Sequence, residues 1–326
     1  MNIYKAVLEP LSSFGTPLLG DMIWGHVCWA LRYLEGERAV NDFITAYDSS
    51  MPLAVSDGFF SGCLPVPVTA PPPQKHWDAL ADKYASKNGA KKSFEAIKKY
   101  RRVTQVSSKI LDPILDSFTL TALIDSMMDA DTIDKEGIIS RSVPRNTIDR
   151  MRGTASAFFT SEERFYYTGS DKNKKSAEFD VYFLCGQEFP VERLKPVLEY
   201  IEREGYGRDR STGRGHFRVN SLKEIKFRAV GKANAVFSLC SFVPAKNDPP
   251  PHAYKVQPRF GRLGGEWGSA QNPFKNGVAL LGAGSTLLCD GGIKPAYGHI
   301  IKNIHADTRI RQYGIMLAHP VRLEDI

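Results

Sequence analysis

The stretch ERLKPVLEYIEREGYGRDRSTGRGHFRV, residues 192–219, decides the fold class of this sequence. Its first half carries apolar residues at helical spacing, its centre contains four glycines, and its end opens an apolar segment rich in β-prone residues. We therefore expect a helix over 192–203, a glycine-rich loop over 205–216 and a strand that begins near residue 217. This order fits the second half of a βαββαβ domain.

The segments before this stretch supply the other elements of such a domain. Glu178–Leu184 and residues 1–8 are rich in apolar and β-prone residues, which predicts strands. Met22–Leu34 has helical spacing, and we expect Asp21 to be its N-cap. The resulting order is typical of a ferredoxin-like, or RNA-recognition-type, domain. The sequence therefore predicts an α+β fold with such a domain over residues 1–228.

The remaining segments predict an insertion, a hairpin and a second domain. We expect a helical insertion at about 37–135, in which 48–73 is irregular or extended because it is dense in Pro, Gly and Ser. Extended segments around a polar tip predict a β-hairpin over about 140–170. Residues 229–326 contain short strands and little helical periodicity. A second ferredoxin-like domain in tandem with the first is the simplest expectation there.

Composition excludes several classes of protein. Of 326 residues, 42% are hydrophobic and 24% are charged, which is ordinary for a folded chain, and the net charge of +7 is modest. No apolar run approaches the roughly 18 residues of a membrane span, and the first residues lack a secretory signal pattern, so we expect a cytoplasmic protein. We expect no metal and no cofactor, because the cysteines stand singly and form no CxxC pair: Cys28, Cys63, Cys185, Cys240 and Cys289.

The glycine-rich loop has the chemistry of an anion site. Four arginines and one aspartate give residues 205–218 a local charge of +3, and glycines let the backbone approach a ligand closely. The loop is not a Walker motif, because GxxxxGK[ST] is absent and a strand follows. The alternative is a flexible turn without function. The predicted RNA-binding residues are Gly207, Arg208, Arg210, Ser211, Thr212, Gly213, Arg214, Gly215 and His216.

The predicted hairpin is also basic. Aromatic residues follow its arginines over 158–167, a pattern that indicates a backbone groove with base-stacking surfaces, unless the aromatics fill the core. Its predicted RNA-binding residues are Arg141, Arg145, Asn146, Ile148, Asp149, Arg150 and Arg152. A weaker basic glycine cluster lies nearer the carboxyl end: Arg259, Arg262, Gly264, Gly265 and Lys275.

Support for catalysis is thinner. His26 lies on the first predicted helix, where a packing or structural hydrogen-bonding role is expected. His216, beside the glycine loop, has the chemistry of a general base toward a ribose hydroxyl, but a loop histidine that contacts RNA or solvent is the favoured interpretation. Asp21 precedes the helix, and its expected N-cap role needs no chemistry. No pair of carboxylates suggests a two-metal site, and we expect a protein without catalytic residues.

Several motifs resemble a known family. The glycine loop is similar to the signature loop of RAMP proteins, the RNA-binding subunits of CRISPR effector complexes, and RNTIDRMRGTA resembles the segment that forms their protruding hairpin, or thumb. Other segments narrow the resemblance to the fourth-subunit family of the type III-A (Csm) complex. These are FGTPLLGDMIWGHVCWAL (14–31), AYDSSMPLAVSDGFFSGCLPVP (46–67), GHIIKNI (298–304) and RQYGIMLAHPV (311–321).

This resemblance implies a noncatalytic subunit for antiviral defence. Members of the family bind the 5′ handle of the CRISPR RNA, dock the large polymerase-like subunit and contact the first backbone subunit. Their thumb wedges against target RNA at the start of the guide duplex. In the backbone subunit an acidic residue cleaves the target, and Asp21 lies in a related place, so a residual nuclease role stays open.

Two alternatives share the fold. One is a metal-independent endoribonuclease that processes CRISPR RNA with His26 or His216. The other is the equivalent subunit of the type III-B (Cmr) complex, which has the same handle role and differs in its partners. A scaffold that never touches RNA is disfavoured by the clustered arginines.

Overall fold

A sheet with two covering helices forms the first part of the molecule. The computed structural model describes residues 1–88, 90–130, 136–169 and 173–324. Its first sheet has the order β10-β1-β9-β2, and β3 pairs with β9. The bounds are β1 Asn2–Pro10, β2 Leu53–Val55, β3 Phe59–Phe60, β9 Phe179–Cys185 and β10 Phe217–Ile225. All these pairs are antiparallel.

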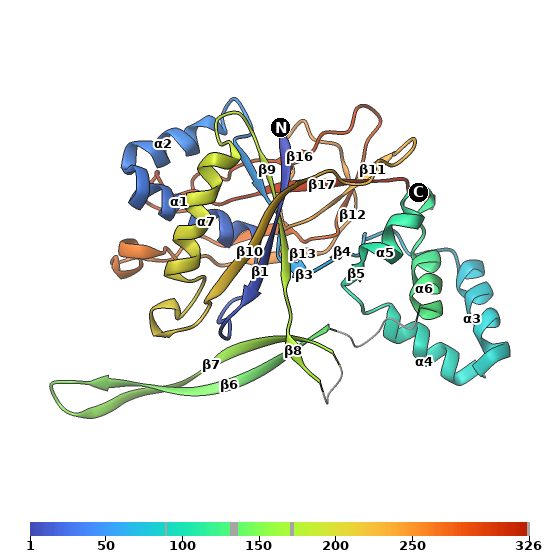
Figure 1. The fold of residues 1–326 in the computed structure, drawn as a ribbon, viewed down its shortest axis with the longest axis horizontal. Helices are drawn as coiled ribbons and strands as arrows, with labels where there is room; N and C mark the ends of the chain where they lie inside the picture. The colour runs from blue at the N-terminus through green and yellow to red at the C-terminus, as the bar shows by residue number, and fades with distance from the viewer. Residues whose placement is uncertain (89, 131–135, 170–172, 325–326) are drawn as a thin grey trace.

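Two helices make the connections that the βαββαβ order requires. Helix α1 (Gly20–Glu35) links β1 to β2, and α7 (Val191–Glu204) links β9 to β10. They pack against each other beside the sheet (Figure 1). The apolar residues that predicted α7 are all buried: Leu194, Val197, Leu198 and Ile201. Strand β2 lies within the proline- and glycine-rich segment that we expected to be irregular or extended.

The N-cap prediction for Asp21 is wrong. Helix α1 begins at Gly20, and the N-cap residue is Leu19, which makes no side-chain capping bond. The amide of Gly20 instead donates a hydrogen bond of 2.7 Å to the Oδ1 atom of Asp57, a residue from the segment after β2. Burial raises the pKa of Asp57 to about 7. A carboxylate distant in sequence thus satisfies the helix end and leaves Asp21 for other contacts.

Helices and a long hairpin are inserted into this domain. Helix α2 (Glu37–Ala46) packs on α1, so the separate helical lobe begins at residue 74 and not at about 37. The predicted ends at 135 and 170 lie outside the described residues. The lobe contains α3 Gln74–Asn88, α4 Ala90–Tyr100, α5 Ser108–Leu111, η1 Asp112–Ser117 and α6 Leu120–Asp129, with β4 Cys63–Pro65 paired to β5 Gln105–Ser107.

The predicted hairpin is present and projects from the body of the molecule (Figure 1). Strand β6 (Glu136–Asp149) pairs with β7 (Thr154–Thr168) over its whole length, and β8 (Lys175–Ser176) adds to the outer edge of β7. At the base, the backbone of Phe14 exchanges two hydrogen bonds with Arg164. The turn after β1 therefore holds the hairpin against the sheet.

The second part of the chain is built of strands. Its sheet has the order β12-β15-β11-β17-β16, and β13 pairs with β14 in a separate ribbon. The described residues 229–324 contain no α-helix, only the short 3-10 helix η3. The α+β class is confirmed, but a second ferredoxin-like domain is not, because its two crossover helices are missing. The bounds are β11 Ala235–Ser238, β12 Pro251–Ala253, β13 Val256–Arg259, η3 Gly265–Ser269, β14 Val278–Leu281, β15 Thr286–Leu288, β16 Ala296–Gly298 and β17 Ile315–Val321.

One hydrophobic core joins the two parts. Tyr313, before β17, is fully buried, and its hydroxyl accepts a hydrogen bond of 2.7 Å from the amide of Val55 on β2. Within the described part of the chain, no helix is both long enough and apolar enough to cross a membrane.

Candidate nucleic-acid interface

The glycine-rich loop follows α7 and contains the 3-10 turn η2 (Arg210–Thr212). Gly207 and Gly215 have positive φ, and both pack against their own chain. A Cβ atom on Gly207 would lie 2.1 Å from Thr16 Oγ1, and one on Gly215 would lie 1.9 Å from the carbonyl oxygen of Tyr206. Gly213 also has positive φ but meets no atom within 4 Å. Two of the three glycines are thus needed for packing within the protein.

The turn between β1 and α1 anchors this loop. Tyr206 is buried, and its hydroxyl donates to the carbonyl oxygen of Pro17 at 2.7 Å and accepts from the amide of Leu19 at 3.0 Å. The amide of Arg208 donates to Thr16 Oγ1 at 3.0 Å. The amide of Gly215 donates to the carbonyl oxygen of Ser13 at 2.8 Å. The loop is therefore held on a rigid element, as a preorganised binding loop needs to be.

Glu163 on β7 ties the hairpin to the loop. Its Oε1 atom accepts a hydrogen bond of 2.6 Å from Arg214 and lies 3.5 Å from the guanidinium of Arg145 on β6. Its Oε2 atom accepts from Ser13 at 3.1 Å. Burial favours a higher pKa for Glu163, but the hydrogen bonds from Arg214 and Ser13 hold the pKa below its usual value. Two arginines predicted to bind RNA thus share one buried carboxylate.

Carboxylates also reduce the local charge of +3 expected from the sequence. Glu163 pairs with Arg214, and Glu9 lies 3.8 Å from Arg218. Arg208 lies 3.6 Å from Asp209, whose charge the value of +3 already includes. Of the loop arginines, only Arg210 has no ion pair among the described residues. Together with exposed Arg208, Ser211, Thr212 and Gly213 it forms the outer edge of the loop, here called the loop rim (208–213).

The hairpin carries five of its predicted residues at or near an exposed tip, whereas Arg141 and Arg145 lie closer to its base. Ile148 is 60% exposed, and the side chain of Arg152 is 82% exposed. Asp149 shapes the tip, since its Oδ1 accepts hydrogen bonds from the amides of Met151 and Arg152. Asn146 and Arg150 are exposed as well. Apolar and cationic side chains therefore stand together at the end of a projecting strand pair.

The aromatic residues after the tip divide into two groups. Phe158 is 78% exposed and Phe159 is 50% exposed, so both are free to contact a ligand. Phe165 is partly exposed, and the guanidinium of Arg141 lies 5.7 Å from its ring. Tyr166 is buried against Phe14 and Phe179. The alternative role of these aromatics, filling the core, therefore applies to Tyr166 and not to Phe158, Phe159 or Phe165.

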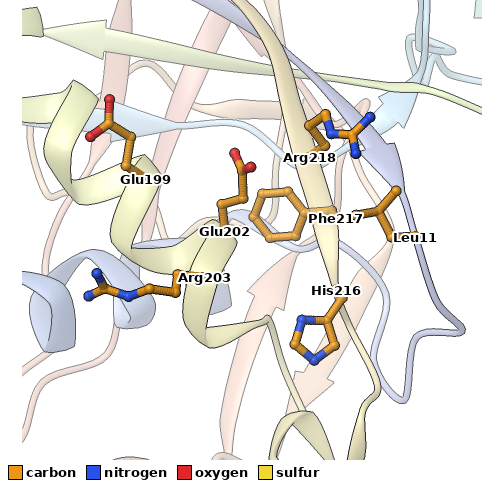
Figure 2. Close-up of a pocket in the computed structure, with 7 residues that line it drawn as sticks. All are labelled: Leu11, Glu199, Glu202, Arg203, His216, Phe217 and Arg218. Atoms are coloured by element: carbon orange, nitrogen blue, oxygen red, sulfur yellow. The ribbon is translucent and has the colours of Figure 1, made fainter.

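His216 lies in a shallow depression between the end of α7 and the start of β10 (Figure 2). Its backbone amide donates to Ser12 Oγ at 2.9 Å. The depression has a volume of about 300 Å³, and carboxylates and guanidiniums mix on its walls. Its lining residues are Leu11, Glu199, Glu202, Arg203, His216, Phe217 and Arg218.

Two residues of the weak basic cluster near the carboxyl end, Arg259 and Lys275, belong to a hydrogen-bond network around Asp21. Arg259 donates to Asp21 Oδ1 at 3.0 Å, and Gln312 donates to Asp21 Oδ2 at 3.0 Å. Lys275 donates to Gln312 Oε1 at 3.1 Å, and burial lowers the pKa of this lysine. Asp21 thus has both carboxylate oxygens occupied. Among the described residues, no group of three or more His, Cys, Asp or Glu side chains is arranged to hold a metal ion.

In the rest of that cluster the two glycines pack on α1, and Arg262 contacts residues that follow it in the sequence. Arg262 donates to the carbonyl oxygen of Gly268 at 3.0 Å, and its guanidinium lies over the ring of Phe274. Gly264 and Gly265 lie against the indole ring of Trp29, where a Cβ atom on Gly265 would come within 2.7 Å. Arg262, Gly264 and Gly265 are exposed residues, and none of these contacts joins them to the loop rim.

Sequence reasoning missed the residues that hold the loop in place. Thr16 and Tyr206 lie within stretches that resemble the family, but no role was predicted for them. No role was predicted for Ser13 or Glu163 either, and the hydroxyl of Ser13 donates to Glu163 across 150 positions of sequence. His26 and Gly207 were both singled out, but not as partners of each other. A single sequence carries no signal for such long-range pairs.

Comparisons with known proteins bear on this fold. No family model matches the chain, and no curated protein does. Solved structures do match: the Csm4 chain of a Csm1-Csm4 cassette in complex with cA4 has a TM-score of 0.59 and 16% identity, over 99% of this chain and 100% of that one. The chain has the fold of Csm4.

Two further Csm4 structures agree. The cassette in complex with AMPPNP gives a TM-score of 0.56 and 18% identity, over 99% of this chain and 98% of that one. The Csm4 chain of a Csm3-Csm4 subcomplex in the type III-A CRISPR-Cas interference complex has a TM-score of 0.54 and 12% identity, over 99% of this chain and 100% of that one. The predicted resemblance to a type III-A fourth subunit is confirmed in fold. The likeness to Csm4 spans both sheets, the lobe and the hairpin.

Proposed function

We propose that this chain is the fourth subunit of a type III-A CRISPR effector complex and binds the 5′ handle of the CRISPR RNA at the loop rim. One observation carries the proposal: in a Csm4 fold, Arg210, which has no ion pair among the described residues, lies beside exposed Ser211, Thr212 and Gly213 on a loop that hydrogen bonds to two other elements hold in place. Guanidinium and hydroxyl groups bind phosphate oxygens, and unstacked bases expose edges to such loops.

The hairpin serves a second contact in this proposal. Its exposed apolar tip and neighbouring arginines suit the end of a duplex, so we assign it to target RNA at the start of the guide duplex. The matching Csm4 chains come from assemblies with Csm1 and with Csm3. On that basis we propose the large polymerase-like subunit and the backbone subunit as the protein partners.

The subunit is proposed to be noncatalytic. A general base needs a free lone pair near the ribose hydroxyl, and the Nε2 atom of His26 already accepts a hydrogen bond from the amide of Gly207. A carboxylate that cleaves RNA needs room for water or metal, and Arg259 and Gln312 fill both oxygens of Asp21. For His216, incubation of the purified protein with repeat RNA tests the endoribonuclease alternative, with His216→Ala as the comparison.

Arg210→Ala tests the handle contact most cleanly. In the reconstituted complex we expect handle RNA to bind about fivefold more weakly, with a salt dependence shallower by about 0.7, as expected for loss of one phosphate contact on a single strand. Fluorescence anisotropy at several salt concentrations measures both quantities. The control is Arg38→Ala on α2, because the Arg38 side chain is 95% exposed and, within the described part of the chain, has Asp42 as its single ion-pair partner.

Equal affinities and slopes for Arg210→Ala, Arg38→Ala and the unchanged protein would contradict the assignment of the loop. The triple variant of Arg208, Arg210 and Arg214 to Ala should lower the affinity further. It is less specific, because loss of Arg214 also disturbs Glu163.

The hairpin tip is tested by Ile148→Asp combined with Arg150→Ala. Both side chains are exposed, so we expect unchanged stability and unchanged loading of CRISPR RNA. The activity that target RNA stimulates in the assembled complex should fall about tenfold, since burial of one aliphatic side chain contributes about 1.5–3 kcal/mol. The control is Thr160→Ala, which is exposed nearer the base of the hairpin. An equal loss of loading and of activity would argue against a role at the duplex.

A further inference from the structure

One side chain of α1 reaches directly into the glycine loop. The Nε2 atom of His26 lies 3.0 Å from the amide nitrogen of Gly207, which donates a hydrogen bond to it. The imidazole ring also lies on the ring of Tyr206, with centroids 5.0 Å apart and an interplanar angle of 36°. His26 therefore contacts the second and third residues of the loop.

We propose that His26 is a positioning residue that holds the glycine loop in its binding conformation through the hydrogen bond from Gly207. The proposal rests on the RNA-binding function proposed for that loop. Glycine has a broad choice of backbone conformations, and Gly207 takes a positive φ of 75°. A fixed acceptor at its amide selects one of these conformations.

The acceptor role defines the protonation state of the ring. An imidazole nitrogen accepts a hydrogen bond only when it carries no proton, so the ring proton of neutral His26 resides on Nδ1. Burial lowers the pKa of His26 to about 4, and the charge of Arg210 adds to this effect. The ring is thus neutral near pH 7, and its single lone pair is used by the protein.

The effect of this bond extends to the loop rim. The next amide, that of Arg208, donates to Thr16 Oγ1, so consecutive amides of the loop are bound by α1 and by the turn before it. Tyr206, on the other side of Gly207, is fixed by its hydroxyl to Pro17 and Leu19. Without the His26 acceptor, the backbone of Gly207 becomes the least restrained position between buried Tyr206 and the arginines of the loop rim.

The experiment compares His26→Leu with His26→Gln in the full chain. Leucine keeps bulk without an acceptor, whereas the Oε1 atom of glutamine is an acceptor on a flexible side chain. Hydrogen exchange measured by mass spectrometry over 205–212 reports on the loop, and anisotropy on the reconstituted complex reports handle affinity. For His26→Leu we expect exchange to rise and affinity to fall, each about fivefold, as for loss of one hydrogen bond. We expect His26→Gln to restore most of both.

The outcomes separate this inference from the proposed function. Unchanged exchange over 205–212 in His26→Leu, or equal exchange in the Leu and Gln variants, would overturn the positioning role. Faster exchange in His26→Leu that His26→Gln reverses, with unchanged handle affinity, would support the positioning role of His26 and count against RNA binding by the loop. Thermal unfolding of both variants tests whether the whole protein has lost stability. A general loss of structure would also raise hydrogen exchange in α7 and β9.

Discussion

Replacement of Glu163 by alanine is expected to lower the free energy of unfolding by about 3 kcal/mol and to weaken handle and target contacts together. The side chain of Glu163 is only 7% exposed, and it neutralises Arg214 of the loop and Arg145 of the hairpin. Arg145 also lies 3.5 Å from Asp209, but removal of Glu163 leaves Arg214 without its carboxylate, and the loss of one partner from a buried pair typically costs several kcal/mol. Chemical denaturation measures the loss of stability.

The neighbouring residue supplies the control for this variant. Glu162 is 48% exposed and pairs with Arg164 on the surface. Because exposed ion pairs contribute about 0–1 kcal/mol, Glu162→Ala should change stability little. Similar small losses for both alanine variants would show that Glu163 does not join the two elements.

The lowered pKa of Glu163 also sets the direction of the pH effect. A carboxyl group whose pKa is lower in the folded state stabilises the protein above its ordinary pKa. That contribution disappears as the pH falls through the folded-state value. The difference in stability between the unchanged protein and Glu163→Ala should therefore shrink in acid.

Gly215→Ala is expected to cost about 3 kcal/mol and to abolish most handle binding. The new Cβ atom would lie 1.9 Å from the carbonyl oxygen of Tyr206, and the φ of 68° disfavours an L-residue. Backbone atoms move only with the loop, so Tyr206 and the bonds to the turn after β1 must shift. Denaturation and handle-RNA anisotropy measure the two effects.

Gly213→Ala is the matched control. Its φ of 85° imposes similar backbone strain, but a Cβ atom there meets nothing within 4 Å. We expect a loss of only about 1–2 kcal/mol, from strain alone. If Gly213→Ala proves as damaging as Gly215→Ala, the close contact with Tyr206 is not the reason for glycine at position 215.

The sequence predicted the elements whose residues repeat regularly. Helix α7 and strands β9 and β10 follow from their spacing, and the long hairpin follows from its extended segments and polar tip. Strand β2 has only three residues within a proline-rich stretch, too few for a periodic pattern. The second sheet is likewise made of short strands, and its order depends on pairing across long separations.

The sequence predicted which residues make up the candidate site but not which of their charges are neutralised by ion pairs. Counting charges along 205–218 assigned a charge of +3 to the loop, yet Glu163 and Glu9 approach from other elements and pair with two of its arginines. In the same way, Asp57 satisfies the helix end that Asp21 was expected to cap. Local counting fails where the fold brings in a partner from far along the chain.

The contacts of Asp21 and Val55 across the seam between the sheets have a consequence for how the polypeptide matures. Arg259 and Tyr313 are synthesised 238 and 258 positions after Asp21 and Val55, so the nascent first part of the chain lacks both partners until late in translation. Its final consolidation comes only when translation has delivered the last strands. Ribosome-bound intermediates of this protein should therefore be prone to chaperone capture until that point.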